Sequence, residues 1–298
     1  MKPAAFDYHR AQTIPDALKL IARFGGEAKV LAGGQSLGPM LNLRVARPAH
    51  VIDLNDLVEL DSVRRAGDRL VVGALTRHHR VATDPEIAAA CPILSAAAAT
   101  IGHYAIRQRG TLGGSLCHAD PAAQMPLVAT LLDAEIRVES AAGRRSLRAR
   151  DFFKASLVTT LAPDEMVTTV AFPVAGPRSG WGFELFSRRH GDFALVSVAT
   201  TLALAPDGTV AELRLALGGI APTSLALDAT LAGHLGARPD AAWRALVAAE
   251  AAAAVAPDDD PLGPALYRTE LAASLATRAL SAALARAGGG LPYEPDDE

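Results

Sequence analysis

The chain contains 298 residues with a formal net charge of −3, and 50% of its residues are hydrophobic. At about 100–200 residues per domain, this length indicates two domains, and this composition can fill two cores. The basic residues are dispersed along the sequence, which argues against a nucleic-acid partner and against an anionic membrane surface. We therefore expect small-molecule or protein partners.

The cysteine content restricts the chemistry that the chain can carry. Cys91 and Cys117 are the only cysteines, too few for a disulfide scaffold, a structural zinc site or an iron–sulfur cluster. The segment Met1–Asp7 lacks the apolar core of a signal peptide, and no apolar run approaches the roughly 18 residues of a membrane span. The sequence thus predicts a cytoplasmic protein that is not integral to a membrane.

Residues 1–55 predict a first lobe built as a β-α-β unit. Thr13 is placed to cap a helix that ends at Phe24, because Pro15 lies in its first turn and two glycines follow it. The remaining predicted elements of this lobe are strands at 6–9, 28–32 and 51–54 and a short helical turn at 37–43.

Residues 56–177 predict a second lobe, which completes a first domain of residues 1–177. Asp120 is placed to cap a helix with Pro121 in its first position, running to Leu132. The other predicted elements are a hairpin of 60–65 and 69–73, helices over 76–83 and 92–99, and strands over 135–140, 144–148 and 166–172.

A segment rich in proline and glycine, 173–180, predicts a linker to a second domain at 178–287. Three strands are expected there first, and two long helices follow them. Strands grouped before helices indicate an α+β domain. The predicted ranges are 181–187, 194–204 and 210–217 for the strands, 240–256 and 265–287 for the helices, and 288–298 for a flexible tail.

Two Gly-Gly segments are the main candidates for a binding site. Ala32–Ser36 follows a buried strand, and Thr111–Ser115 precedes the helix predicted after Asp120. Adjacent glycines let backbone N–H groups converge on an anion, and the hydroxyl groups of serine and threonine add donors without charge. Each segment alone is more often a plain turn, but as a pair they make a diphosphate ligand about as probable as coincidence. The common dinucleotide and phosphate-loop fingerprints are absent.

The histidines show no pattern of metal ligands. His103, His118 and His190 lack metal-ligand spacing, and we interpret His78 and His79 as solvated surface at the start of a helix. The sequence contains no constellation of a catalytic acid, base or nucleophile that we can identify. We therefore predict neither a catalytic residue nor a metal site in this chain.

Several other polar or aromatic residues allow two interpretations. Arg107 and Arg109 could meet phosphate oxygens, but an alternating Arg-Gln-Arg is at least as often an exposed edge, so both stay off the predicted site. Asp120 is explained as a helix cap, and it could also accept a hydrogen bond from a sugar hydroxyl. The segment around Phe193 is most simply interpreted as a charged turn before a strand. Alternatively, it places Phe193 against an aromatic cofactor.

The run Ile106–Pro126, together with Ala32–Leu37 upstream, resembles the FAD-binding medium subunit of the molybdenum hydroxylases. This family includes the carbon monoxide dehydrogenase, xanthine dehydrogenase and nicotine dehydrogenase types. The resemblance extends over almost the whole chain, because Arg189–Val198 and the pair Tyr267-Arg268 also match family positions.

The resemblance implies an α+β flavoprotein whose two-lobed FAD-binding domain is of the vanillyl-alcohol-oxidase (PCMH) type, followed by the C-terminal α+β domain. Carried over by position, 32–36 and 111–115 would hold the FAD diphosphate through backbone N–H groups. Leu161 would lie near the flavin ring and Phe193 would face the isoalloxazine. The implied FAD-binding residues are Ala32, Gly33, Gly34, Gln35, Ser36, Ile101, Gly102, Thr111, Leu112, Gly113, Gly114, Ser115, Asp120, Gln124, Leu161 and Phe193.

Three positions depart from patterns seen in the family or its wider fold. Ser115 stands where asparagine is common and keeps a hydrogen-bonding group, whereas Gln124 replaces a common acid and leaves its contact to the adenosine half of FAD open. Gln35 stands where some relatives of the wider fold attach flavin covalently through histidine. We therefore expect dissociable FAD.

The function implied by the resemblance is electron transfer within a heterotrimeric molybdenum hydroxylase. A large subunit with a molybdenum cofactor would oxidise the substrate, a small subunit with 2Fe-2S clusters would relay electrons, and FAD in this chain would pass them to NAD, a quinone, oxygen or a carrier protein. The alternatives are a stand-alone flavin oxidase or reductase of the same fold and a non-enzymatic nucleotide-binding or assembly module. The substrate, the electron acceptor and the stoichiometry of the complex stay open.

Overall fold

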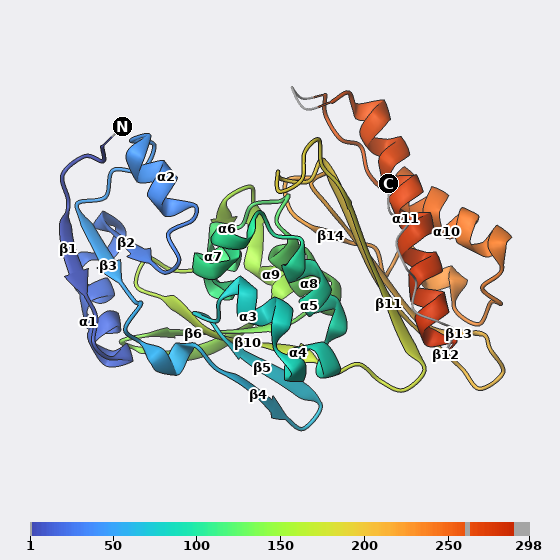
Figure 1. Ribbon diagram of the computed structural model, residues 1–298, viewed down its shortest axis with the longest axis horizontal. Helices are drawn as coiled ribbons and strands as arrows, with labels where there is room; N and C mark the ends of the chain where they lie inside the picture. Colours follow the sequence, from blue (N-terminus) through green and yellow to red (C-terminus); the bar gives the residue numbers. More distant parts are fainter. Residues whose placement is uncertain (1, 260–262, 289–298) are drawn as a thin grey trace.

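The computed structural model describes residues 2–259 and 263–288. The chain forms three parts in a row: a small N-terminal lobe, a central lobe with most of the helices, and a C-terminal sheet covered by two long helices (Figure 1). This mixture of helices and separate sheets confirms the predicted α+β class. None of the helices in the described ranges is both long and apolar enough to cross a bilayer.

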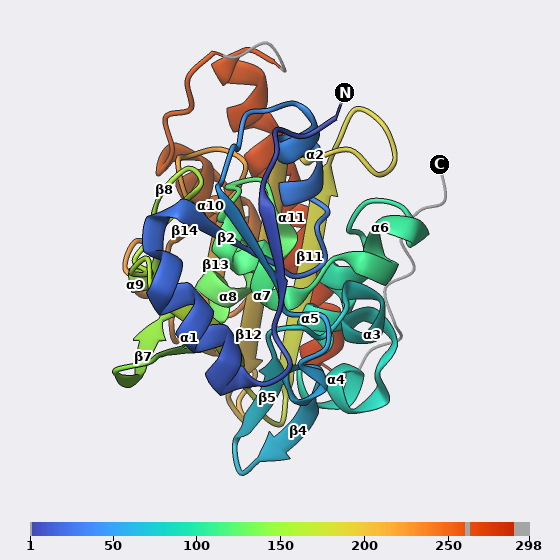
Figure 2. The same ribbon diagram turned by 90° about the vertical axis from the view of Figure 1, so that its left-hand side faces the viewer.

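The first lobe has a three-stranded parallel sheet in the order β1-β3-β2. Thr13 caps α1, as the sequence predicts, by accepting a hydrogen bond from the Asp16 amide. In the view turned by 90°, this sheet and α1 lie in front of the other two parts (Figure 2). The elements are β1 (Asp7–Arg10), α1 (Ile14–Phe24), β2 (Ala28–Leu31), α2 (Leu37–Asn42) and β3 (His50–Asp53).

The second lobe is organised around a five-stranded antiparallel sheet in the order β4-β5-β10-β6-β7. Its helices gather beside this sheet (Figure 1). The strands are β4 (Val63–Ala66), β5 (Arg69–Gly73), β6 (Glu135–Ser140), β7 (Gly143–Arg148) and β10 (Met166–Pro173). The helices are α3 (His78–Thr83), α4 (Pro85–Ala90), α5 (Pro92–Ala99), α6 (Tyr104–Arg109), α7 (Leu112–His118), α8 (Gln124–Leu132) and α9 (Ala149–Phe152), and a small hairpin joins β8 (Phe153–Ala155) to β9 (Val158–Thr159).

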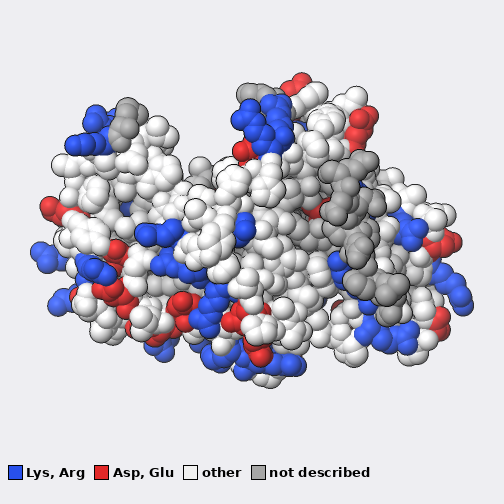
Figure 3. All heavy atoms as spheres, viewed as in Figure 1, with Lys and Arg blue, Asp and Glu red and all other residues white. Residues whose placement is uncertain are grey.

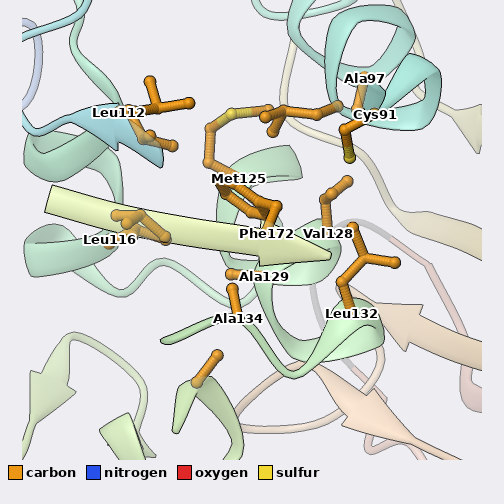
Figure 4. Close-up of a cluster of buried hydrophobic side chains, with 14 of the residues drawn as sticks. Cys91, Ala97, Leu112, Leu116, Met125, Val128, Ala129, Leu132, Ala134 and Phe172 are labelled. Carbon is orange, nitrogen blue, oxygen red and sulfur yellow. The ribbon is translucent and has the colours of Figure 1, made fainter. Parts of the chain in front are cut away.

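Helix α8 lies at the centre of the largest core. Every residue of α8 is buried, because β13 of the C-terminal sheet (Val210–Gly218), α5 and further strands and helices pack around it. Figure 4 shows the side chains that meet there from α5, α7, α8 and β10. At about 0.8 kcal/mol per buried CH₂, such a core dominates the stability of this lobe. Its labelled members are Cys91, Ala97, Leu112, Leu116, Met125, Val128, Ala129, Leu132, Ala134 and Phe172.

The C-terminal domain contains an antiparallel sheet in the order β11-β12-β13-β14. Because successive side chains of a strand point to opposite faces, this sheet contributes to two cores. The paired Ala199 and Ala216 face the core of the second lobe, whereas Val198 packs in the core beneath α10 and α11. Small side chains therefore let α8 approach the sheet closely. The elements are β11 (Ser179–Phe186), β12 (Val196–Leu204), β13 (Val210–Gly218), β14 (Leu225–Ala226), α10 (Ala241–Ala253) and α11 (Ala265–Ala287).

Helix α11 contacts β11 almost backbone to backbone. A methyl group on Gly180 would lie 1.8 Å from the carbonyl oxygen of Ala283, and one on Gly182 would lie 2.0 Å from that of Ala279. The intervening Trp181 and the following Phe183 point the other way and pack against the second lobe. The two glycines thus bring the long helix onto the sheet.

Most long elements are predicted correctly, including the start and end of α11, whereas several short ones are missed. The sequence analysis did not identify α4, α6, α7, α9 or the β8-β9 hairpin, which are short elements held by tertiary packing. The helix predicted to begin at Pro121, after a cap at Asp120, begins at Gln124. The tail predicted at 288–298 lies, after Gly288, outside the described residues.

The prediction that His78 is solvated is wrong. Only 5% of this residue is exposed, and its Nδ1 has no hydrogen-bond partner in the described ranges. Its backbone amide donates to the carbonyl of Gly110, 2.9 Å away. Burial, reinforced by the neighbouring Arg77 cation, lowers the pKa of His78 to about 4. The imidazole is therefore neutral at physiological pH and forms part of the support beneath the second glycine segment.

The first prediction concerns the contact between α11 and β11. We expect Gly182→Ala to destabilise the C-terminal domain by roughly 1–3 kcal/mol, because its methyl group meets the Ala279 carbonyl and the helix must move away. Chemical unfolding followed by circular dichroism measures the change. The control is Gly176→Ala, since no atom lies within 4 Å of the added methyl group. Equal unfolding midpoints for the two variants would show that the contact is looser than described.

A second prediction follows from the buried His78. Its folded pKa of about 4 lies below the ordinary value of 6.5, so its neutral form stabilises the fold above pH 6.5, and this contribution is lost as the pH falls from 6.5 towards 4. The loss amounts to about 3 kcal/mol, from 1.36 kcal/mol per pKa unit. We expect the unfolding free energy of wild type to fall with acidification more steeply than that of His78→Gln. Parallel curves between pH 7 and 4.5 would contradict this explanation.

Candidate functional site

The first glycine segment turns sharply at the end of β2. Gly33 is buried, and a methyl group there would lie 2.1 Å from the carbonyl oxygen of Arg109 and 2.8 Å from Cα of Gly110. Gly34 has φ +71°, a conformation that side chains disfavour. Only glycine at position 33 allows the first lobe to contact the second at this point.

The backbone amides of residues 33–37 form an open row of donors. None of them donates a hydrogen bond to any group in the described part of the chain, although the carbonyls of Gly34 and Ser36 accept bonds from Gly38 and Met40. Gly33 is buried and residues 34–37 are partly buried, so this segment does not project into solvent. Successive backbone N–H groups of this kind form a concave site for an anion. The first segment is therefore a candidate site for an anion, as a diphosphate would require.

The second glycine segment is not the loop that the sequence predicts. Thr111 caps α7 through a bond from the Gly114 amide to its Oγ1, and α7 already begins at Leu112. The amides of Leu112 and Gly113 donate to the carbonyls of Thr76 and Ala74, at 3.0 and 2.8 Å. The expectation that backbone N–H groups throughout 111–115 are available to phosphate is corrected accordingly. The Ser115 hydroxyl, in contrast, has no hydrogen bond within the described residues and stays available.

Close packing explains why glycines occur in this second segment. A methyl group on Gly113 would lie 2.6 Å from Cβ of Ala74, and one on Gly114 would lie 2.7 Å from Oγ1 of Thr111. The same methyl group on Gly114 would be 3.8 Å from Cβ of Ala32, in the first segment. The structure therefore brings the two predicted segments together. The first segment provides the row of amide donors, and the second mainly packs against it.

Asp120 does not cap a helix as the sequence predicts, whereas Gln124 is helical as predicted. The Asp120 carboxylate accepts a bond from the Ala122 amide at 2.9 Å and so closes a turn before α8. Gln124, 8% exposed, is the first residue of α8, and its side-chain amide lies 3.5 Å from the carbonyl oxygen of Thr100. Gln124 thus contacts the residue that precedes Ile101 and Gly102.

The remaining predicted residues lie along the second lobe and its border with the C-terminal domain. Ile101 and Leu161 are half-buried and pack against the core of the second lobe. Gly102 has φ +46° in the turn before α6. Arg107, interpreted from sequence as an exposed edge, donates to the carbonyls of Ile101 and Gly102, at 2.9 Å each. This bond pair holds the turn in place.

Phe193 is 62% exposed and lines a cavity of about 660 Å³ between the second lobe and the C-terminal domain. Asp120 and Ser156 line it from the second lobe, and Ile220 and Arg268 from the C-terminal domain. The molecular surface is hollowed between the first lobe and the C-terminal domain (Figure 3). An exposed aromatic ring beside a cavity lined by both apolar and polar side chains is suited to a flat aromatic group that carries polar substituents.

Two residues that sequence reasoning missed connect the glycine segments. The guanidinium of Arg77 donates to the Arg109 carbonyl and to Oδ1 of Asn55, the latter at 2.6 Å. Asn55 in turn donates to the carbonyl of Ala32 at 2.9 Å. The sequence signal was weak, since Asn55 only follows a predicted strand and Arg77 lies at the start of a predicted helix. Among the described residues, no group of three or more histidine, cysteine or acidic side chains is arranged to hold a metal ion.

Comparison with protein-family models identifies both halves of the chain. Residues 4–175 match the FAD-binding domain in molybdopterin dehydrogenase, and residues 181–283 match the C-terminal domain of the carbon monoxide dehydrogenase flavoprotein. Together these matches cover nearly the whole sequence.

Similar proteins and structures belong to related complexes. The 6-hydroxypseudooxynicotine dehydrogenase complex subunit alpha of Paenarthrobacter nicotinovorans is 37% identical, over 96% of this chain and 97% of that protein. The carbon monoxide dehydrogenase medium chain of Hydrogenophaga pseudoflava is 35% identical, over 96% and 99%.

Solved structures agree with these matches. Carbon monoxide dehydrogenase from H. pseudoflava superposes with a TM-score of 0.92 at 36% identity, covering 96% of this chain and 99% of that one. Quinoline 2-oxidoreductase from Pseudomonas putida 86 also gives 0.92, at 34% identity, over 96% and 99%. The chain therefore belongs to the family of FAD-binding medium subunits of molybdenum hydroxylases, which are flavoprotein subunits of oxidoreductase complexes.

Proposed function

We propose that this chain binds FAD non-covalently and acts as the electron-transfer subunit of a heteromeric molybdenum hydroxylase. It would accept electrons from the 2Fe-2S clusters of a small subunit and pass them to an external acceptor. A large subunit with the molybdenum cofactor would oxidise the substrate. The observation that carries the proposal is the open row of backbone amides at 33–37, beside the second glycine segment.

The residues of the site suit FAD in two respects. Unpaired backbone N–H groups bind a diphosphate without needing a lysine, which agrees with the absence of a phosphate-loop motif. The exposed Phe193 and the adjoining cavity suit the flat isoalloxazine. When bound, FAD supplies a carrier that exchanges one or two electrons.

The proposed roles of this chain's residues are binding and orientation. Residues 32–36 and the Ser115 hydroxyl would bind the diphosphate, with Thr111–Gly114 as the wall that keeps this row in place. Ile101 and Gly102 would lie along the cofactor, supported by Gln124 through Thr100 and by Arg107. Leu161 and Phe193 would contact the flavin, and Asp120 would meet a polar group at the cavity. No acid, base or nucleophile of this chain is assigned to the reaction.

The partners and the location belong to the same proposal. Several relatives are named as medium chains or as subunits of dehydrogenase complexes, which supports assembly with an iron–sulfur subunit and a molybdenum subunit. The low cysteine content fits clusters held by a partner and a reducing compartment such as the cytoplasm. The acceptor is a quinone, NAD, oxygen or a carrier protein.

The third prediction tests cofactor and partners together. The purified chain is expected to show flavin absorption bands, to release FAD into the supernatant on acid precipitation, and to contain no iron. Affinity purification from its native cells should also recover iron and molybdenum with their subunits. A colourless chain that fails to bind added FAD would refute the proposal. A flavoprotein that oxidises a substrate without partners would support a stand-alone enzyme instead.

The fourth prediction concerns Gly33. We expect Gly33→Ala to raise the Kd for FAD roughly 100-fold or more, because its methyl group collides with the Arg109 carbonyl and displaces the amide row. The matched control is Gly38→Ala in the same lobe, whose methyl group meets no atom within 4 Å. Flavin fluorescence titration of both variants, with their thermal midpoints, gives the comparison. Equal Kd values for FAD in the two variants would show that the amide row does not bind the cofactor.

A further inference from the structure

Asn55 binds the oxygen of the peptide that starts the amide row. The Ala32 carbonyl and the Gly33 amide belong to one planar trans peptide, so they point in opposite directions. The bond of 2.9 Å from the Asn55 side chain to the Ala32 oxygen therefore fixes where the Gly33 N–H points. Asn55 aims the first donor of the row away from itself.

Hydrogen bonds to Asp53 hold Asn55 in position. Its backbone and side-chain amides both donate to Oδ1 of Asp53, at 2.8 and 2.5 Å, and Oδ2 of Asp53 accepts from the Tyr8 hydroxyl. Burial opposes the charge of Asp53, but these bonds outweigh it and lower the pKa of this carboxyl. The Asn55 side chain thus has one orientation, in which its Oδ1 is left to accept from Arg77.

Arg77 connects this arrangement to the other lobe. One end of its guanidinium donates to Oδ1 of Asn55, and the other donates to the Arg109 carbonyl, which is the oxygen that lies against Gly33. A planar fork can span two such acceptors at a fixed separation, and a lysine ammonium cannot. Arg77 therefore sets the spacing between the two glycine segments.

The charge of Arg77 has no carboxylate partner in the described ranges. Both of its acceptors are neutral oxygens, and Asp53 and Asp61 act on it only at longer distance. Burial, and then the nearby Arg109 cation, lower the pKa of Arg77, which shows that its charge is poorly compensated. A bound anion would supply the missing compensation.

We propose that Arg77 and Asn55 are positioning residues for the FAD diphosphate: Asn55 aims the Gly33 amide, and Arg77 fixes the distance between the two glycine segments and contributes positive potential to the site. This inference rests on the proposed function, because it concerns the same ligand. A purely structural tether between the lobes is the alternative that the experiment must separate from it.

The test titrates the flavin-free full chain with ADP, which carries the diphosphate without the flavin, and with FAD. We expect Arg77→Met to raise both Kd values roughly 10- to 100-fold, and Asn55→Ala roughly 10-fold. The fold increase in Kd of the double variant should be smaller than the product of the two single increases, because the two residues act as one unit. A structural tether predicts lower thermal midpoints with unchanged Kd values.

The dependence of ADP affinity on salt concentration distinguishes an electrostatic role of Arg77 from a purely geometric one. ADP affinity of wild type should fall with ionic strength, and Arg77→Met should flatten this dependence. Arg77→Lys should keep the dependence but bind more weakly than wild type, because the ammonium cannot span both acceptors. The matched control is Arg80→Met in α3, the helix that Arg77 precedes. This variant removes an equal charge, bound to Asp61 and Asp84, and should leave both Kd values within about threefold of wild type.

The outcomes are distinct. Wild type that binds neither ADP nor FAD would overturn the proposed function and this inference together. Wild type that binds both, with Kd values and salt dependence unchanged in Arg77→Met and Asn55→Ala, would overturn only this inference. If Arg77→Met fails to fold, Arg77→Lys and Asn55→Ala decide the question by the same readouts.

Discussion

The contact between Gly33 and the Arg109 carbonyl is the constraint on which the site depends. It brings the backbones of two lobes so close that a Cβ atom would lie 2.1 Å from the oxygen. Because the peptides touch directly, the open amides of 33–37 are held next to the second glycine segment and do not move with a flexible loop. The remaining parts of the first two lobes can be understood as the support of this contact.

Support comes from polar bonds on one side and from packing on the other. Asn55 and Arg77 tie the carbonyls that flank the contact, and the buried, neutral His78 lies beneath Gly110. On the opposite side, α7 and α8 belong to a fully buried core. Since interiors are packed as densely as organic crystals, such a core transmits little movement to the site.

The sequence predicted much of this organisation and missed parts of it for identifiable reasons. The long amphipathic α1 and α11 and the strands of the C-terminal sheet follow from periodicity and caps. Helix α7 was missed, because the sequence predicts a loop where Thr111 caps this helix. The start of α8 was misplaced, because Asp120 closes a turn and does not cap a helix. His78 was taken as exposed, since two adjacent histidines carry no signal of burial.

The sequence by itself determined the α+β class, the two glycine segments and, through resemblance, the family. Local patterns carry this information because caps, glycines and apolar periods act over a few residues. Only the tertiary structure decided which amides are open, that Arg77 and Asn55 join the segments, and that Phe193 borders a cavity. These features depend on residues far apart in the chain, whose hydrogen bonds and contacts exist only once the lobes have packed together.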